Sequence, residues 1–362
     1  MTSGSPAARA ELSIKGVARR WSRARPAWRP HGTGHALAAA RPLVPLVLDS
    51  LPPDSTARGW VVQRELWTET GTALFMVGPA AQPPEIVVKL SRLREALARS
   101  ETTLVSRLLA DPALGDWCRL LPAPVAQGHV SGRPFIVERA LPGVAGTDLV
   151  SDQDRDRLLL AAADSIARLH RATAVSRTVD DVLLGRWVDN PVNVVRAMTA
   201  RRPRALRYDA ALDRLSVRLR AGLATREVAT CVVHGDYWSG NLLATTDGSA
   251  ITGIVDWDQG SSAEVPWQDI LHLLLYERRV SQRQEFGDVV RAALEEPRWT
   301  PAEEAVLRTG SWATTHQVGM DTYILLCWLR HVAANIVQQL GHQEHGMIIW
   351  ELRNVRNVLA VV

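Results

Sequence analysis

Short apolar runs separated by turns dominate the first 140 residues, which is the pattern expected of strands. The runs lie at residues 59–63, 73–77, 84–90, 125–129 and 134–138. Between the third and fourth runs, leucines recur at helical spacing over residues 94–110, and Asp111 and Pro112 end that segment. This part of the chain is therefore predicted to form an antiparallel sheet with one helix.

Long amphipathic runs replace this pattern beyond residue 143. They cover residues 152–173, 191–223, 264–279, 283–296, 301–317 and 320–340. One interruption, residues 232–258, holds two apolar pieces, 241–244 and 251–255, on either side of Asp247 and Gly248, the pattern of a hairpin. We expect a mainly helical second half interrupted by one hairpin.

These patterns divide the chain into three parts. Residues 1–45 are a basic extension rich in arginine, proline and tryptophan, and we interpret it as a solvated tail or a packed extension rather than a partner-binding arm. Residues 46–140 are the expected sheet-containing domain, and residues 141–362 the expected helical domain. Together they predict an α+β protein.

Composition excludes several classes of protein. With 46% hydrophobic and 22% charged residues, the chain of 362 residues is expected to fold around a core. Its net charge of +4 comes from the first 50 residues, so nucleic-acid binding is not expected. The apolar run at 323–328 is too short to cross a bilayer, so no membrane association is expected. Three cysteines cannot form a complete set of disulfides, which favours a cytoplasmic location.

The hairpin region carries the residues with the clearest chemistry. Asp236 and Asn241 lie five residues apart in a predicted loop, and Asp256 ends the hairpin. Two carboxylates and an amide in this order suit phosphoryl transfer, in which one carboxylate orients a hydroxyl and oxygen ligands hold Mg²⁺ against nucleotide phosphates. The donor expected for such a site is a nucleoside triphosphate, ATP or GTP.

The segment His234–Asn241 together with Ile254–Asp258 resembles the aminoglycoside phosphotransferase family, which includes choline-kinase-like and fructosamine-kinase-like enzymes. The resemblance implies a two-lobed protein-kinase-like fold, with an antiparallel-sheet N-lobe that binds the nucleotide and a mainly helical C-lobe. It covers about residues 60 to 345 and implies an ATP-dependent kinase of small molecules.

The same resemblance assigns roles within the catalytic segment. It implies that Asp236 is the catalytic carboxylate and that Asn241 and Asp256 ligate Mg²⁺. Asp269, at the expected start of a helix, is implied to support the catalytic loop. We interpret His234 as a residue that steadies this loop rather than as a general base.

Lys89 is the expected phosphate-binding residue of the N-lobe. Only it and Lys15 are lysines, whereas 40 basic residues are arginine, so a lysine that ends an apolar strand indicates a specific use for a compact ammonium group. The resemblance implies that a helix glutamate holds this lysine. Glu101 fits that position best, and Glu95 is the alternative.

Two further nucleotide contacts follow from the resemblance. Thr70 and Gly71 belong to the expected phosphate loop, which has a single glycine where protein kinases have several. The backbone from Glu138 to Ala140 corresponds to the hinge that receives the adenine.

The acceptor is expected to be a small molecule with a hydroxyl group. The family acts on aminoglycosides, other antibiotics, choline, sugars and amino-acid-like alcohols, and the acidic last third of this chain favours a cationic acceptor. Candidate acceptor contacts are Trp238, Asp258 and Glu264, with Glu277 and Asp321 as further acidic residues. The alternative function is a nucleotide-binding regulatory pseudokinase or a partner-binding module, against which the complete Asp/Asn/Asp set argues.

Overall fold

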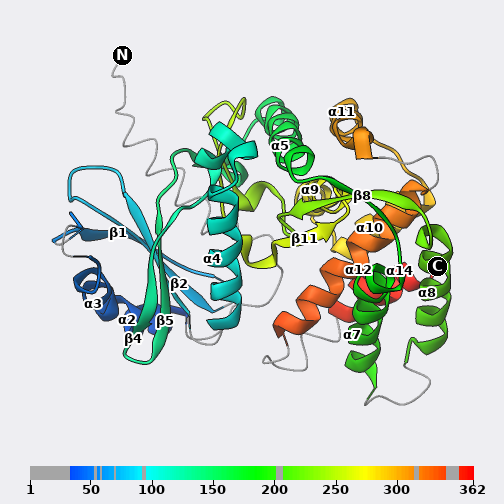
Figure 1. Cartoon of the computed structure of the whole chain (residues 1–362), viewed down its shortest axis with the longest axis horizontal. Coiled ribbons are helices and arrows are strands. Elements are labelled where there is room, and N and C mark those ends of the chain that lie inside the picture. The colour runs from blue at the N-terminus through cyan, green and yellow to red at the C-terminus, as the bar shows by residue number, and fades with distance from the viewer. Residues whose placement is uncertain are drawn as a thin grey trace. The chain divides into compact units, whose positions relative to one another are not determined.

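The computed structural model describes residues 33–52, 55–57, 59–68, 71–91, 95–200, 207–313, 318–339 and 350–362 (Figure 1). The chain packs into two units. Of the described residues, the first unit comprises those up to residue 154 and residues 240–258, and the second comprises those within 155–239 and 259–362. The hairpin region is therefore divided between the two units. Residues 232–239 belong to the second unit, whereas residues 240–258 return to the first unit and pack with its sheet.

An antiparallel sheet of five strands forms the centre of the first unit, in the order β1-β2-β3-β5-β4. Its strands are β1 (Val61–Trp67), β2 (Thr72–Gly78), β3 (Ile86–Ser91), β4 (Pro124–Val130) and β5 (Arg133–Arg139). The helix α4 (Glu95–Leu109) follows β3, and the 3-10 segment η2 (Pro112–Leu120) follows α4. The predicted antiparallel sheet with one intervening helix is confirmed.

Two short helices before the sheet also belong to its core. They are α2 (Thr33–Ala40) and α3 (Val44–Asp49), joined by η1 (Arg41–Leu43). Val44, Val47 and Leu48 are buried in one cluster with Phe75 and Val137 of the sheet. The end of the N-terminal extension is thus packed, because its apolar residues cover the sheet; residues 1–32 lie outside the described residues.

A small second sheet in the first unit contains the predicted hairpin. Its strands run in the order β10-β9-β6, with β6 (Val144–Ala145), β9 (Leu242–Ala244) and β10 (Ile251–Ile254), and η3 (Gly146–Asp148) follows β6. After β10, the Trp257 side chain is fully buried and meets the Trp117 ring edge-on, with ring centroids 6.2 Å apart. These contacts fix the chain on both sides of Asp256.

Helices dominate the second unit, as predicted. They are α5 (Asp152–Ala172), α6 (Asp181–Leu184), η4 (Gly185–Asp189), α7 (Asn190–Thr199), α8 (Asp209–Leu223), α9 (Trp267–Gln282), α10 (Phe286–Glu295), α11 (Pro301–Gly310), η8 (Ser311–Ala313), α12 (Met320–Gln339), η9 (Leu352–Arg356) and α14 (Asn357–Leu359). The sequence did not predict a sheet of β7 (Val175–Thr178), β8 (Glu227–Val233) and β11 (Ser261–Glu264), with β8 in the middle. Within the described residues, no helix has both the length and the apolar character needed to cross a bilayer.

Candidate active site

Lys89 lies at the centre of a buried ion-pair cluster in the first unit. Its Nζ atom is 2.8 Å from Oε1 of Glu101 on α4 and 2.9 Å from Oε2 of Glu138 on β5. The side chain of Lys89 is 15% exposed and those of the two glutamates are 6% exposed. The sheet sets this arrangement, because Val87 of β3 pairs with Glu138 and places it diagonally beside Lys89.

The charges in this cluster shift the pKa values of its members. Burial opposes the charged form of Lys89, but Glu101, Glu138 and Asp256 together raise the pKa of its ammonium group well above the usual range. Burial raises the pKa of Glu138 to about 7, although Lys89 opposes this shift. The cluster therefore holds a permanent cation beside a carboxyl group that titrates near neutral pH.

Glu101 also connects Lys89 to the end of the hairpin. Its Oε1 atom accepts a hydrogen bond from the Trp257 amide at 3.3 Å. Asp256, the preceding residue, has a left-handed backbone with φ of 66°, which is uncommon for a residue other than glycine and often marks a functional position. The side chain of Glu95 is outside the described part of the chain, whereas Glu101 forms the ion pair with Lys89.

Asn241 and Asp256 flank the hairpin in the first unit. The amide of Val255 donates a hydrogen bond to the Asn241 carbonyl at 3.0 Å, which holds the two ends of the hairpin together. Asn241 is 3% exposed, whereas Asp256 is exposed. An amide and an exposed carboxylate at neighbouring positions fit Mg²⁺, which binds a few protein oxygens and keeps several waters. Asp258, in η7 (Trp257–Gln259), is half-buried.

The loop at residues 234–239 of the second unit follows β8 and is held by one buried carboxylate. Asp269, in the first turn of α9, accepts hydrogen bonds from the amides of His234 and Gly235, both at 2.8 Å. Its Oδ2 atom also lies 2.9 Å from Nε2 of His170. Burial would raise the pKa of Asp269, but these partners lower it below its usual value. His234 and Asp269 are thus both placed to support the loop backbone.

Replacing Asp269 by asparagine is expected to destabilise this loop, because an amide NH₂ group would face backbone N–H groups in a site without exposure. Each unsatisfied buried polar group costs about 1–3 kcal/mol, so the free energy of unfolding should fall by roughly 2–4 kcal/mol. Denaturant unfolding measures this change. The matched control is Asp321→Asn, because that side chain is 47% exposed; equal losses in the two variants would contradict the supporting role.

Asp236 projects from the supported loop with its side chain 32% exposed. Its amide donates to Nδ1 of His234 at 3.3 Å, and its Oδ1 atom lies 3.4 Å from Nε2 of His272 on α9. A partly exposed carboxylate on a rigid loop can receive a proton from a bound hydroxyl group. His272 was not identified from the sequence, because it lies within an apolar helical run that looks like core.

The residues after Asp236 are packed into the second unit. The Trp238 ring lies against Tyr276, with ring centroids 4.6 Å apart, and is 8% exposed. The Ser239 amide donates a hydrogen bond to Oε1 of Glu277 at 2.9 Å, and burial raises the pKa of Glu277. Both contacts fix the loop, so the surface of Trp238 available for a substrate is small.

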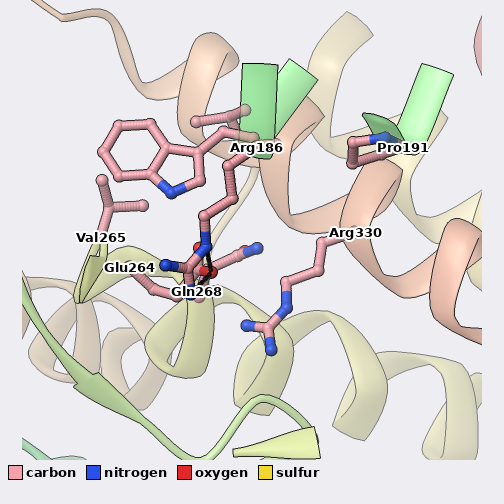
Figure 2. Close-up of a pocket in the computed structure, with 8 residues that line it drawn as sticks. Arg186, Pro191, Glu264, Val265, Gln268 and Arg330 are labelled. Atoms are coloured by element: carbon pink, nitrogen blue, oxygen red, sulfur yellow. Dashed lines mark hydrogen bonds and ion pairs between the residues drawn. The ribbon is translucent and has the colours of Figure 1, made fainter. Parts of the chain in front are cut away.

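A pocket lined by both charged and apolar side chains lies in the second unit (Figure 2). Its lining residues are Arg186, Trp187, Pro191, Glu264, Val265, Gln268, Leu326 and Arg330. Figure 2 shows Arg186 facing Glu264, and these side chains form an ion pair at 2.9 Å. Nη2 of Arg330 donates to the Gln259 carbonyl at 2.7 Å. Nη1 of Arg330 is buried and, within the described residues, has no hydrogen-bond partner.

The backbone around Gln259 explains why the loop carries glycine at position 235. Gly235 has φ of 84°, and a Cβ atom there would overlap the Gln259 carbonyl oxygen and lie 2.7 Å from Nη2 of Arg330. The pocket and the residue before Asp236 are therefore in direct contact. The acidic character expected for the acceptor site is reduced, since Glu264 pairs with Arg186 and Asp321 pairs with Arg218 at 2.8 Å.

The expected phosphate loop and hinge are less fully described. Gly71 has φ of 83° in the turn between β1 and β2, and its amide donates to the Thr68 carbonyl at 3.1 Å. Thr70 lies outside the described residues. At the hinge, the Ala140 amide donates to the Glu85 carbonyl at 2.8 Å. The sequence indicated only a backbone role for Glu138, whereas in the structure the Glu138 side chain forms an ion pair with Lys89.

A family model for the phosphotransferase enzyme family matches residues 65–306 of the chain. A search of curated protein sequences found no match.

Solved structures of small-molecule kinases resemble the chain at low sequence identity. A Ralstonia eutropha protein provisionally assigned as an aminoglycoside phosphotransferase is 15% identical, with a TM-score of 0.54 over 90% of this chain and 96% of that one. An aminoglycoside-3'-phosphotransferase of type VIII is 19% identical, with a TM-score of 0.49 over 84% of this chain and 99% of that one. A glucosamine kinase is 15% identical, with a TM-score of 0.41 over 91% of this chain and 98% of that one. The first of these confirms the kinase-like fold.

Proposed function

We propose a reaction for this chain. The chain belongs to the phosphotransferase enzyme family and is a small-molecule kinase. The proposed reaction transfers the γ-phosphoryl group of ATP to a hydroxyl group of a sugar-like or cationic alcohol. The O–H bond of the acceptor breaks, its oxygen bonds to the γ-phosphorus, and ADP leaves. Asp236 orients the hydroxyl and takes its proton. The observation that carries this proposal is the partly exposed Asp236 carboxylate on a loop that Asp269 holds.

The Lys89 cluster is the proposed site for the nucleotide phosphates. Its ammonium group is held by Glu101 and Glu138, and the neighbouring carboxylates raise its pKa well above the usual range, which supports a role in binding anionic phosphates. The turn at Gly71 and the backbone from Glu138 to Ala140 are the proposed phosphate loop and hinge. GTP is the alternative donor.

Asn241 and Asp256 are the proposed Mg²⁺ ligands. When bound, Mg²⁺ neutralises charge on the nucleotide phosphates. The two side chains present the oxygen donors that this ion prefers, and the hydrogen bond between Val255 and Asn241 keeps them at neighbouring positions.

A Mg²⁺-dependent rise in thermal stability is expected on addition of ATP. At 100 times the dissociation constant, a ligand stabilises the native state by about 2.7 kcal/mol, which raises Tm by about 2–4 °C. The variant Asp256→Asn should lose most of this shift, since it removes one carboxylate while asparagine tolerates the left-handed backbone. A full shift in Asp256→Asn, or in wild type with a chelator, would remove Asp256 from the metal site.

The acceptor is proposed to be rich in hydroxyl groups. The pocket beside Gly235 supports this, because the buried Nη1 of Arg330, which lines it, needs an oxygen acceptor. Acceptor-dependent ADP release from a panel of amino sugars, neutral sugars, choline and sugar acids tests this class. Turnover with choline alone would contradict this hydroxyl-rich class and would leave a cationic alcohol as the acceptor. An antibiotic such as an aminoglycoside belongs to the proposed class.

A further inference from the structure

Two histidines lie beside the proposed catalytic carboxylate, and the phosphoryl transfer described above uses neither of them. Nε2 of His272 on α9 lies 3.4 Å from Oδ1 of Asp236 and 3.2 Å from Nδ1 of His331 on α12. The three ligand atoms all lie within 4.8 Å of one another. Four ligands around Zn²⁺ at about 2.0–2.1 Å are separated from each other by roughly 3.4 Å, which is close to both of these distances.

Hydrogen bonding fixes which nitrogen of His272 is available. Its Nδ1 atom lies 3.1 Å from the Tyr237 carbonyl oxygen, and this oxygen can only accept, so Nδ1 carries the proton. The lone pair of neutral His272 is therefore on Nε2, the atom that faces Asp236 and His331. A ring whose other N–H donates to a backbone carbonyl is the usual arrangement of a metal-binding histidine.

His331 can become a ligand by exchanging one proton. Its Nε2 atom faces Nδ2 of Asn335 at 3.0 Å, so in the metal-free protein the proton of neutral His331 lies on Nδ1 and points toward Nε2 of His272. Metal binding would replace that proton. Asn335 would then turn its amide to present its oxygen to an Nε2–H group, and would give up the hydrogen bond that its Nδ2 atom donates to the His331 carbonyl at 2.9 Å. His272 is 2% exposed, whereas Asp236 and His331 are half-buried, so an ion could enter past these two side chains.

We propose that Asp236, His272 and His331 form a binding site for Zn²⁺ and similar divalent transition cations, and that its occupation inhibits the enzyme. Two imidazoles and one carboxylate favour such ions over Mg²⁺, which prefers oxygen ligands. The cation would withdraw electron density from the Asp236 carboxylate and reduce its capacity to accept a proton. The site itself stands independently of the proposed function; its inhibitory effect rests on that function.

Binding of Co²⁺ to the full-length protein, followed by its visible absorption, tests the site without any acceptor. Wild type should bind Co²⁺, and Zn²⁺ should displace it. The variant His331→Phe, which keeps a ring beside Phe286, should bind at least about 10-fold more weakly, since even supporting residues of metal sites are worth that factor. The matched control His129→Gln removes an exposed histidine of β4 and should bind like wild type.

Further variants and an inhibition assay complete the test. Asp236→Asn should also weaken Co²⁺ binding, which keeps the proposal testable if His331→Phe folds poorly by circular dichroism. Equal affinity in wild type, His331→Phe and Asp236→Asn would overturn the site. With Mg-ATP and an acceptor present, Zn²⁺ should inhibit wild type at concentrations at least about 10-fold lower than His331→Phe. Binding without inhibition would overturn the regulatory effect only, and would leave both the metal site and the proposed reaction intact.

Discussion

The variant Asp236→Asn is expected to lower kcat by about 10²- to 10⁴-fold, the range that general acid–base catalysis contributes. Asparagine has nearly the same shape but cannot take the proton of the acceptor hydroxyl. Because Asp269 and not Asp236 holds the loop backbone, the fold and the affinity for Mg-ATP should remain close to those of wild type. Steady-state kinetics with varied ATP, together with Mg-ATP binding, separate the two effects.

A matched carboxylate controls for the loss of charge. Asp213 on α8 is 68% exposed, so Asp213→Asn should leave kcat unchanged. If Asp236→Asn retained wild-type kcat, the proton acceptor would have to be another group. A loss of Mg-ATP binding in the same variant would instead assign Asp236 to the nucleotide site.

The variant Lys89→Met is expected to produce the largest loss of stability. It removes the cation between two buried carboxyl groups, and breaking a buried ion pair from one side costs about 3–5 kcal/mol. Affinity for Mg-ATP should fall as well, since no ammonium group remains to meet the phosphates. Denaturant unfolding and nucleotide titration measure the two losses.

The loss of stability in Lys89→Met should depend on pH. The buried carboxyl groups determine whether this loss grows or shrinks as pH rises. The pKa of Glu138 is raised from 4.5 to about 7 while Lys89 is present, and removing the cation raises it further. A carboxyl group whose pKa is higher in the folded state than in the unfolded state lowers the free energy of unfolding as pH rises. This loss accumulates between the unfolded-state pKa and the folded-state pKa. The difference between wild type and Lys89→Met should therefore be larger at pH 8 than at pH 5.

The exposed cation Arg119 provides the comparison for this variant. Its guanidinium pairs with Asp116 at the surface, where both side chains are more than three-quarters exposed. Arg119→Met should change the free energy of unfolding by less than about 0.5 kcal/mol. A pH-independent loss in Lys89→Met, or an equal loss in Arg119→Met, would contradict the buried cluster.

The elements with a clear period were predictable from the sequence. The alternation along β2 and β3 and the long amphipathic run of α5 indicated strand and helix correctly, because buried side chains recur at the strand or helix period in these elements. β7 was missed because its four residues are all exposed and carry no alternation. β8 was missed because its run is almost continuously buried, which periodicity alone cannot distinguish from a helix.

Part of the candidate site depends on contacts that sequence spacing does not contain. Lys89 was identifiable because lysine is rare in this chain, and the motif around Asp236 was specific enough to suggest phosphoryl transfer. The pairing of Glu138 with Lys89 comes from the register between β3 and β5. His272 and His331 meet because α9 and α12 pack together, although 59 residues separate them in the chain.

Transfer of the γ-phosphoryl group to the acceptor is tested by following that group itself. Wild-type protein is incubated with Mg²⁺, ATP labelled at the γ-phosphate, and a hydroxyl-rich amino sugar, and the products are separated. We predict that the label appears in a phosphate ester of the acceptor, with ADP formed in equal amount, and that Asp236→Asn forms this ester at least about 100-fold more slowly. Label that stays in ATP across the whole acceptor panel, or appears only as inorganic phosphate, would contradict phosphoryl transfer to an acceptor hydroxyl group.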